Sequence, residues 1–361
     1  MKILLLGEFS SLHRYLKEGL TELGHEVTLG ATGDGWKKIG GADFSPFAEN
    51  SRSYPERCLK QLLGAKKLTG YDVCQFINVS LFALAVRKRI IKRVHSGNSC
   101  LSLCACGGDL ALVRAYNNKC FDYFAYDYDK SVCRKYDSKS FRGRMLTSAD
   151  NYLTGKADVI IPSMFEYAQG YKGSDRLYDV IPLPINTSGI GYSDNILRGK
   201  LVIFHGINNE LGKGTPFIRE AMERLKEKYP DDVEIIMEGH LPFDEYVKLM
   251  SRTNVVIDQC CGYSYGINAC IALAQGKVVL TGARPEAMKL LGGEETPIFM
   301  VKPDSDQIFS QLEYILKNKE RITEWGRSSR EYVERVHNNV NIAGRYVKAW
   351  QSAIERRKSS E

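Results

Sequence analysis

The chain has 361 residues, enough for about two domains at a typical ~150 residues each. Its 43% hydrophobic and 26% charged residues exclude a disordered, collagen-like or coiled-coil protein. The formal net charge of +7 is too small for a histone-like chain, and no nucleic-acid recognition motif accompanies it.

The first thirty residues predict a β-α-β unit. Residues 3–6 form the apolar run of a buried strand, residues 12–23 carry apolar side chains at helical spacing, and residues 26–29 form the next strand. The apolar stretch at the start of the chain is too short for a signal peptide. No apolar run approaches the ~18 residues that a membrane-spanning helix needs. We therefore expect a cytoplasmic protein, with its ten cysteines as buried reduced thiols.

Further strands are expected at 71–78, 100–106 and 157–162, with a helix at 81–95. A stretch rich in Pro, Gly, Ser, Asp and Asn at 183–199 predicts a linker. A second series follows, with strands at 201–204, 233–237, 255–258 and 278–281 separated by helices, and a helical tail from about residue 304. Thr215 is expected to cap a helix that Pro216 opens. The prediction is therefore an α/β protein of two Rossmann-like, doubly wound parallel sheets facing a cleft, with domains at 1–190 and 191–361.

Two loops of the second half carry the residues of an anion site. The loop 205–215 follows a strand and opens a helix, and its glycines, its backbone N–H groups and Lys213 suit a diphosphate. Alone, it could equally be a flexible loop with one solvated lysine. The loop 263–269 is a second candidate cradle at the same expected edge of the sheet. No GxGxxG or Walker A pattern is present, which disfavours a dinucleotide-dependent dehydrogenase.

These motifs resemble those of GT-B glycosyltransferases, in particular the large group 1 family, also called family four. The resemblance rests on Lys213-Gly214, on the polar segment 258–266 and on Ala274-Gln275-Gly276-Lys277, in that order over roughly residues 200–340. In the first half, the opening Gly7 loop and residues 24–27, 34–36, 106–109 and 157–162 are similar to bacterial surface-polysaccharide transferases. The family usually has two glutamates at the positions of Tyr263 and Ile271, which this chain lacks.

The resemblance implies a hexosyltransferase that uses a nucleotide sugar, needs no metal or other cofactor, and serves a glycan or lipid-linked acceptor in polysaccharide biosynthesis. Asp109 and Lys213 would be catalytic, although Asp109 could as well be a helix N-cap. Gly7, His13 and Trp36 would contact the acceptor, although Gly7 could be a plain turn and His13 a surface residue. The donor would bind Gly206, Asn208, Asn209, Lys213, Gly214, Asp258, Tyr263, Tyr265, Gly266 and Asn268.

Asp127-Tyr128-Asp129 resembles a metal-binding Asp-x-Asp motif of a different glycosyltransferase fold. Three residues match by chance easily, and the adjacent Lys130 indicates an exposed polar turn. We expect no metal there.

The positive charge is uneven along the chain. Residues 51–93 hold ten Lys and Arg against Glu56 and Asp72, and the run 87–93 lies on an apparently amphipathic helix. Either this helix presents an ordinary solvated face, or it contacts an anionic membrane surface, which would place the protein at the inner face of the membrane.

Three functions remain open from the sequence. The leading one is the glycosyltransferase. The second is a sugar-nucleotide epimerase or hydrolase of the same architecture, and the third is a non-catalytic homologue that binds a sugar nucleotide. Dependence of turnover on an acceptor discriminates between them.

Overall fold

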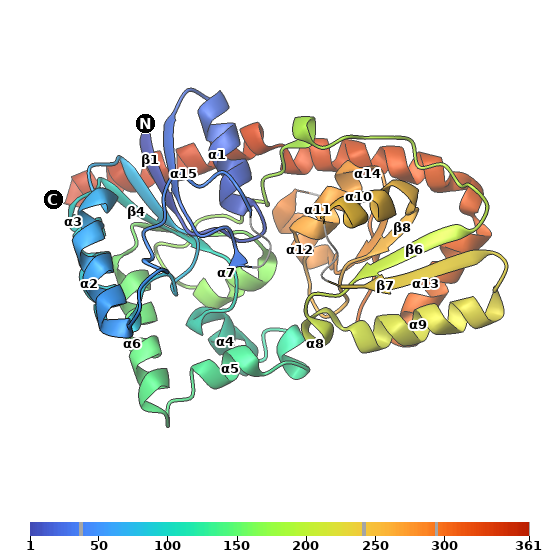
Figure 1. Ribbon diagram of the computed structural model, residues 1–361, viewed down its shortest axis with the longest axis horizontal. Helices are drawn as coiled ribbons and strands as arrows, with labels where there is room; N and C mark the ends of the chain where they lie inside the picture. The colour runs from blue at the N-terminus through green and yellow to red at the C-terminus, as the bar shows by residue number, and fades with distance from the viewer. Residues whose placement is uncertain (36–38, 240–242, 293–294, 361) are drawn as a thin grey trace. The chain divides into compact units, whose positions relative to one another are not determined.

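A computed structural model describes all residues except 36–38, 240–242, 293–294 and 361. The chain divides into two compact units (Figure 1). Unit 1 comprises Met1–Cys120, Ser131–Asn186 and Asn339–Glu361, and unit 2 comprises Phe121–Lys130 and Thr187–Asn338.

Unit 1 is built on a five-stranded parallel sheet in the order β2-β1-β3-β4-β5. Its strands are β1 (Lys2–Leu6), β2 (Glu26–Gly30), β3 (Val73–Phe76), β4 (Cys100–Ala105) and β5 (Val159–Pro162). Side chains of a strand alternate between the two faces of a sheet. Leu4 and Leu6 of β1 therefore pack into one core, and Ile3 and Leu5 pack into another on the opposite face.

Helices cover both faces of this sheet, which explains the continuous apolar runs of its strands. The core on the Leu4 side includes residues of α2 and α3, and the core on the Ile3 side includes residues of α1 and α15. The helices of unit 1 are α1 (Leu12–Glu22), α2 (Tyr54–Gly64), α3 (Leu84–Ser96), α4 (Leu110–Asn117), α5 (Ser131–Lys135), α6 (Phe141–Lys156), α7 (Phe165–Tyr171) and α15 (Asn339–Ser360), with the 3-10 turn η2 (Ala65–Leu68).

Unit 2 repeats the plan with a parallel sheet in the order β10-β9-β8-β6-β7. Its strands are β6 (Leu201–Gly206), β7 (Val233–Glu238), β8 (Val255–Ile257), β9 (Val278–Thr281) and β10 (Phe299–Met300). Its helices are α8 (Glu210–Lys213), α9 (Thr215–Lys228), α10 (Phe243–Arg252), α11 (Ile267–Ala274), α12 (Pro285–Leu291), α13 (Ser305–Lys317) and α14 (Ile322–His337), with the 3-10 turns η3 (Ala125–Asp127), η4 (Thr187–Gly189) and η5 (Lys319–Arg321). The prediction of two doubly wound parallel sheets is confirmed.

The units differ from the predicted domains 1–190 and 191–361 at two places. The change of unit at Asn186 falls inside the predicted linker, but α15 packs on unit 1 because Tyr346 and Trp350 are fully buried in its core. Phe121–Lys130 in turn belongs to unit 2. Neither exchange has a local sequence signal, because both depend on contacts between residues far apart in the chain.

Two smaller expectations also need comment. Thr215 is the first residue of α9 rather than its cap, since Gly214 occupies the N-cap position in a left-handed conformation. All ten cysteines are free thiols; seven are buried, as expected, whereas Cys58 and Cys133 are partly exposed and Cys120 is exposed. Among the described residues, no helix combines the length and apolarity needed to cross a bilayer.

Candidate functional site

Each sheet has a switch point, where the chain continues on one side of a strand and then on the other. In the first sheet, β1 lies between β2 and β3. In the second sheet, β6 lies between β7 and β8. Ligands of open α/β sheets bind outside the carboxyl ends of the strands at such a point. The loops after β1 and β3 in unit 1, and after β6 and β8 in unit 2, are therefore the places where a site is expected.

In unit 2, a buried ion pair joins these two loops. Lys213 Nζ lies 2.8 Å from Asp258 Oδ1 and donates to the Gly206 carbonyl oxygen at 3.2 Å. The Lys213 and Asp258 side chains are only 10% and 4% exposed. The ammonium has three N–H donors, and these two contacts use two of them. The predicted donor residues Gly206, Lys213 and Asp258 thus come together at the carboxyl edge of β6 and β8.

Glycine and histidine fix the backbone beside that pair. Gly214 has φ +76°, and a Cβ there would lie 2.3 Å from Cys260 Sγ and 2.7 Å from Cys261 Sγ. His205 is fully buried, and its ring nitrogens contact the Ile257 carbonyl at 2.8 Å and Thr215 Oγ1 at 2.9 Å. Burial lowers the pKa of His205 to about 4, so the ring is neutral at physiological pH.

Four other residues predicted to bind the donor belong to the same two loops, and they differ in solvent exposure. Asn208, Asn209 and Asn268 are exposed, and Asn209 caps α8 by accepting from the Gly212 N–H. Gly266 is the N-cap of α11, and a Cβ there would lie 3.9 Å from Asp258 Oδ2. Two helices, α9 and α11, therefore begin close to the ion pair.

The two predicted donor tyrosines are occupied elsewhere, which corrects that part of the prediction. Tyr265 is 1% exposed, and its hydroxyl contacts the Tyr332 hydroxyl and His337 Nε2, each at 2.8 Å. Tyr263 is 3% exposed, and its hydroxyl accepts a 2.6 Å hydrogen bond from the Asp122 N–H. Both side chains stabilise the packing of unit 2.

The segment 121–130, which contains the Asp-x-Asp pattern, covers Tyr263. The rings of Phe121 and Tyr123 lie 5.6 and 5.3 Å from the Tyr263 ring, and the Arg284 guanidinium lies 5.0 Å from it. Arg284 also pairs with Asp122 at 3.0 Å. The position at which the family usually has a glutamate is thus enclosed by aromatic rings.

In unit 1, the predicted acceptor residues have structural roles. Gly7 has φ +86°, and a Cβ there would lie 2.5 Å from Ile77 Cγ2. His13 is fully buried, with Nδ1 2.8 Å from the Gly7 carbonyl and Nε2 3.1 Å from Gln75 Nε2. Burial lowers the pKa of His13 to about 3. His13 is therefore neither a surface residue nor free for an acceptor, and Trp36 lies outside the described residues.

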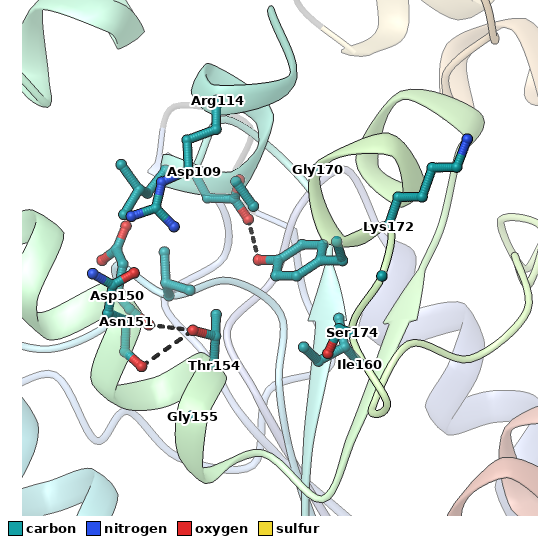
Figure 2. A pocket seen from close by; sticks show the side chains of 15 residues that line it. Asp109, Arg114, Asp150, Asn151, Thr154, Gly155, Ile160, Gly170, Lys172 and Ser174 are labelled. Carbon is teal, nitrogen blue, oxygen red and sulfur yellow. Dashed lines mark hydrogen bonds between the residues drawn. The ribbon is translucent and has the colours of Figure 1, made fainter. Parts of the chain in front are cut away.

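Asp109 is the N-cap of α4, the alternative that its sequence left open. Its Oδ1 accepts from the Leu112 N–H at 2.8 Å, and its Oδ2 accepts from the Tyr171 hydroxyl at 2.5 Å (Figure 2). The carboxyl is 2% exposed, and burial raises its pKa. Asp109 lines a pocket of about 390 Å³ together with residues of α4, α6 and the end of α7 (Figure 2).

A second buried carboxyl, Asp150, lines the same pocket. It accepts from the Tyr136 hydroxyl at 2.5 Å and lies 3.6 Å from the buried Arg87 guanidinium. Burial raises the pKa of Asp150 to about 6. Arg87 donates to the Phe82 carbonyl and is 4% exposed, so it does not contribute to the predicted basic surface.

Sequence reasoning missed Glu8, the residue that follows Gly7 at the end of β1. Glu8 is 6% exposed, and burial raises its pKa to about 7. A charged residue in the loop after a buried strand was the available signal. Among the described residues, no group of three or more His, Cys, Asp or Glu side chains is arranged to hold a metal ion.

The chain is similar to a glycosyl transferase-like family model and to several solved structures that share one fold. Residues 211–348 match a family model described as "Glycosyl transferase-like". The chain has the GT-B fold. Sucrose-phosphate synthase from Thermosynechococcus elongatus is similar over 99% of this chain and 100% of its own, with 14% identity and a TM-score of 0.66. Comparison with curated protein sequences finds no match.

Two further similar structures hold nucleotides. The Anabaena protein HepE, solved with UDP and glucose, is similar over 98% of this chain and 100% of its own, with 13% identity and a TM-score of 0.63. A UDP-GlcNAc 2-epimerase from Neisseria meningitidis, bound to UDP-GlcNAc, matches 98% of this chain and 100% of its own, with 12% identity and a TM-score of 0.55. Transferases and epimerases thus share this fold.

Proposed function

We propose that the protein is a glycosyltransferase that moves a hexose from a nucleotide sugar to a hydroxyl of a glycan or lipid-linked acceptor in polysaccharide biosynthesis. The observation that carries the proposal is the Lys213–Asp258 pair at the carboxyl edge of unit 2, beside the beginnings of α9 and α11. Helix N-termini and a lysine together attract phosphate groups. The glycosyl transferase-like match over residues 211–348 supports the same assignment.

In the proposed reaction, the donor diphosphate binds at this edge. The third N–H of Lys213 Nζ and the backbone N–H groups of the two loops stabilise the negative charge that grows on the leaving nucleoside diphosphate. Asp258 and the Gly206 carbonyl hold the ammonium in place, so Lys213 needs little reorganisation when the charge develops. No metal is proposed, because the lysine and helix N-termini supply positive charge.

A panel of nucleotide sugars with membrane lipid extract tests this proposal. We expect release of nucleoside diphosphate only when donor and acceptor are both present, and a loss of at least tenfold in donor affinity for Lys213→Ala. Lys226→Ala, an exposed lysine on α9, is the matched control. Equal donor affinity of the wild type and Lys213→Ala would refute the phosphate role of Lys213.

The same assay separates the other two functions. An epimerase or hydrolase would turn over the nucleotide sugar without an acceptor, and the Neisseria epimerase shows that the fold is compatible with that outcome. A non-catalytic homologue would bind the nucleotide sugar without turnover. Either result would replace the transferase proposal.

We also propose that an anionic membrane surface is a partner of unit 1. α2 exposes Leu59 and Leu63, which are 57% and 66% accessible and stand one helical turn apart. Exposed basic side chains also occur just before and on α2, on η2 and on α3: Arg52, Lys60, Lys66, Lys67, Lys88, Arg89, Lys92 and Arg93. Exposed leucines on a helix that lies among Lys- and Arg-rich elements are typical of a membrane interface.

Cosedimentation with lipid vesicles tests the membrane contact. We expect binding to phosphatidylglycerol vesicles, weaker binding as salt is raised, and little binding to phosphatidylcholine vesicles. Leu59→Ser with Leu63→Ser should weaken binding several-fold, whereas Leu290→Ser, a 43% exposed leucine of unit 2, should not. Equal binding of the double variant and the wild type would refute the role of Leu59 and Leu63.

A further inference from the structure

The segment Phe121–Lys130 packs on the carboxyl edge of the unit 2 sheet, although the residues on either side of it in the chain belong to unit 1. Five of its ten side chains are aromatic rings. At one end, two of these rings lie against the Tyr263 ring in the loop after β8. At the other end, the Tyr128 ring meets the Phe217 ring in the first turn of α9 edge to face, with the ring centres 5.3 Å apart. The segment therefore contacts the elements that follow both β6 and β8, the strands that carry the proposed donor site.

The 3-10 turn η3 gives this segment a fixed shape. The Asp127 carboxylate accepts a 2.8 Å hydrogen bond from the Phe124 N–H. The N–H groups of Tyr128 and Asp129 donate to the Ala125 carbonyl at 3.2 and 2.9 Å. The first aspartate of the Asp-x-Asp pattern thus closes a turn, and this turn contacts α8, the short helix that carries Lys213.

α8 depends on its neighbours for its position. It has only four residues, too few for a helix to be stable by itself, and Gly214 ends it in a left-handed conformation. On one side, the Cys260 N–H donates to the Lys213 carbonyl at 2.9 Å. Ala125 and Phe217 pack against the hydrophobic core that contains Cys260. The backbone that carries Lys213 is therefore held by the loop after β8 and by segment 121–130.

We propose that segment 121–130 positions Lys213 for the diphosphate of the donor, with Tyr128 as the positioning residue. The proposal rests on the proposed transferase function, which gives Lys213 its phosphate role. Tyr128 acts through Phe217 and through η3, which together hold the corner between α8 and α9. Because Lys213 Nζ lies 2.8 Å from Asp258 Oδ1, a shift of α8 by about 1 Å takes this pair out of hydrogen-bond range. An edge-to-face pair of rings changes an equilibrium constant by about two- to tenfold, which sets the size of the expected effect.

The first test measures how firmly Lys213 is held. Brief acetylation with acetic anhydride, followed by mass spectrometry, gives the reaction rate of each lysine. Lys213 should react slowly in the wild type, because its ammonium is buried and paired, and about two- to tenfold faster in Tyr128→Ala. Tyr128→Phe keeps the ring and should restore the wild-type rate. Lys226, an exposed lysine of α9, should react at one rate in all of these proteins.

A matched control separates this effect from a general loosening of unit 2. Tyr314 is 47% exposed, and its ring also contacts a ring of unit 2, at 6.3 Å from that of Phe299, so Tyr314→Ala should leave the Lys213 rate unchanged. A wild-type Lys213 rate in Tyr128→Ala, or faster reaction of Lys213 and Lys226 together, would overturn the proposal. If Tyr128→Ala does not fold, Tyr128→Leu keeps an apolar side chain without the ring and carries the same expectation.

The second test measures phosphate binding by calorimetric titration with inorganic pyrophosphate and with UDP. We expect the affinity for both to fall by about two- to tenfold in Tyr128→Ala and to return in Tyr128→Phe. Tyr314→Ala should bind both as the wild type does. Equal affinity of Tyr128→Ala and the wild type for pyrophosphate would mean that the ring does not position the phosphate-binding lysine, and the proposal would be wrong.

The two proposals fail in distinguishable ways. If the wild type binds neither pyrophosphate nor UDP, the phosphate role of Lys213 fails, whereas faster acetylation of Lys213 in Tyr128→Ala would still establish that segment 121–130 holds this lysine in place. If the wild type binds pyrophosphate and Tyr128→Ala binds it equally well, only the role of the segment fails. Urea unfolding of each variant shows whether its fold is intact.

Discussion

The β1–α1 loop of unit 1 and the β6–α9 loop of unit 2 occupy the same place in two similar sheets. They differ in how their buried ionisable side chains are paired. In unit 2, the Lys213 ammonium is paired with Asp258 and a carbonyl, and His205 has partners on both ring nitrogens. In unit 1, the Glu8 carboxyl is buried and accepts from the Arg14 N–H in the first turn of α1. The unit 2 loop thus holds a cation beside an anion, whereas in the unit 1 loop burial and the nearby Asp34 carboxylate raise the pKa of the Glu8 carboxyl to about 7.

The largest expected effect concerns the paired loop. Asp258→Ala leaves the buried Lys213 ammonium without its carboxylate and should cost about 3–5 kcal/mol of unfolding free energy, measured by urea denaturation. The double variant Lys213→Met with Asp258→Leu should recover most of that loss, because it removes both charges. A double variant as unstable as Asp258→Ala would show that packing, rather than charge, accounts for the loss.

Replacing the glycine of each loop by alanine should cost more stability in the unit 2 loop than in the unit 1 loop. Gly214→Ala brings a Cβ to 2.3 Å from the buried Cys260 Sγ and should cost about 2–4 kcal/mol. Gly7→Ala brings a Cβ to 2.5 Å from Ile77 Cγ2 and 2.7 Å from a half-buried Leu81, which can move, so we expect about 1–3 kcal/mol. Both values come from urea unfolding, and a larger loss for Gly7→Ala would contradict the comparison.

The loops should also give opposite responses to pH. The pKa of Glu8 is raised from 4.5 to about 7, so its contribution to stability is complete below pH 4.5 and is lost as pH rises to 7. The pKa of His205 is lowered from 6.5 to about 4, so its contribution is complete above pH 6.5 and is lost as pH falls to 4. Each change amounts to about 3 kcal/mol at most.

Melting temperatures of Glu8→Gln and His205→Gln, each compared with the wild type at pH 5 and pH 8, measure these responses. Relative to the wild type, Glu8→Gln should be more stable at pH 8 than at pH 5. His205→Gln should be less destabilised at pH 5 than at pH 8. The same sign for both variants would mean that the two loops do not differ in the way proposed.

The smallest effect concerns backbone strain. Ser11→Gly removes the steric cost of φ +74°, partly offset by the greater entropy of glycine in the unfolded chain, so we expect a gain of about 0.5 kcal/mol. Asn209→Ala, at the N-cap of α8 in the paired loop, should instead lose about 1 kcal/mol. Chemical denaturation of the two variants beside the wild type checks the contrast, and a loss of stability for Ser11→Gly would contradict it.

Much of the fold was readable from the sequence because its strands are buried on both faces. The continuous apolar run of β1 and the glycine after α1 are local signals that predict a strand and a helix end. Helices α2 and α5 to α7 lacked such clear spacing and were not predicted, whereas α4 was anticipated only as the alternative in which Asp109 caps a helix. The placements of α15 and of residues 121–130 depend on tertiary contacts, which no local pattern contains.

The site was predicted less completely, for a physical reason. Sequence position brought Gly206, Lys213 and Asp258 to one edge, since carboxyl ends of parallel strands share that edge. It could not show that Tyr265 and His13 turn into cores, because a polar side chain in a loop has the same sequence signal whether it is buried or exposed. Glu8 was missed because its burial, which raises the pKa of its carboxyl, depends on tertiary packing that no local pattern contains.

The position of α15 has a consequence for the order in which the protein is made. A ribosome synthesises residues 187–338, nearly all of unit 2, before it reaches Asn339–Glu361. Until those residues emerge, unit 1 lacks the helix that carries Tyr346 and Trp350, and the sheet face bearing Ile3 and Leu5 has no such cover. Domains usually fold in the order of synthesis, beginning at the N-terminus. Here the unit that is started first is completed last, so its core cannot be fully packed until the last residues of the chain have emerged.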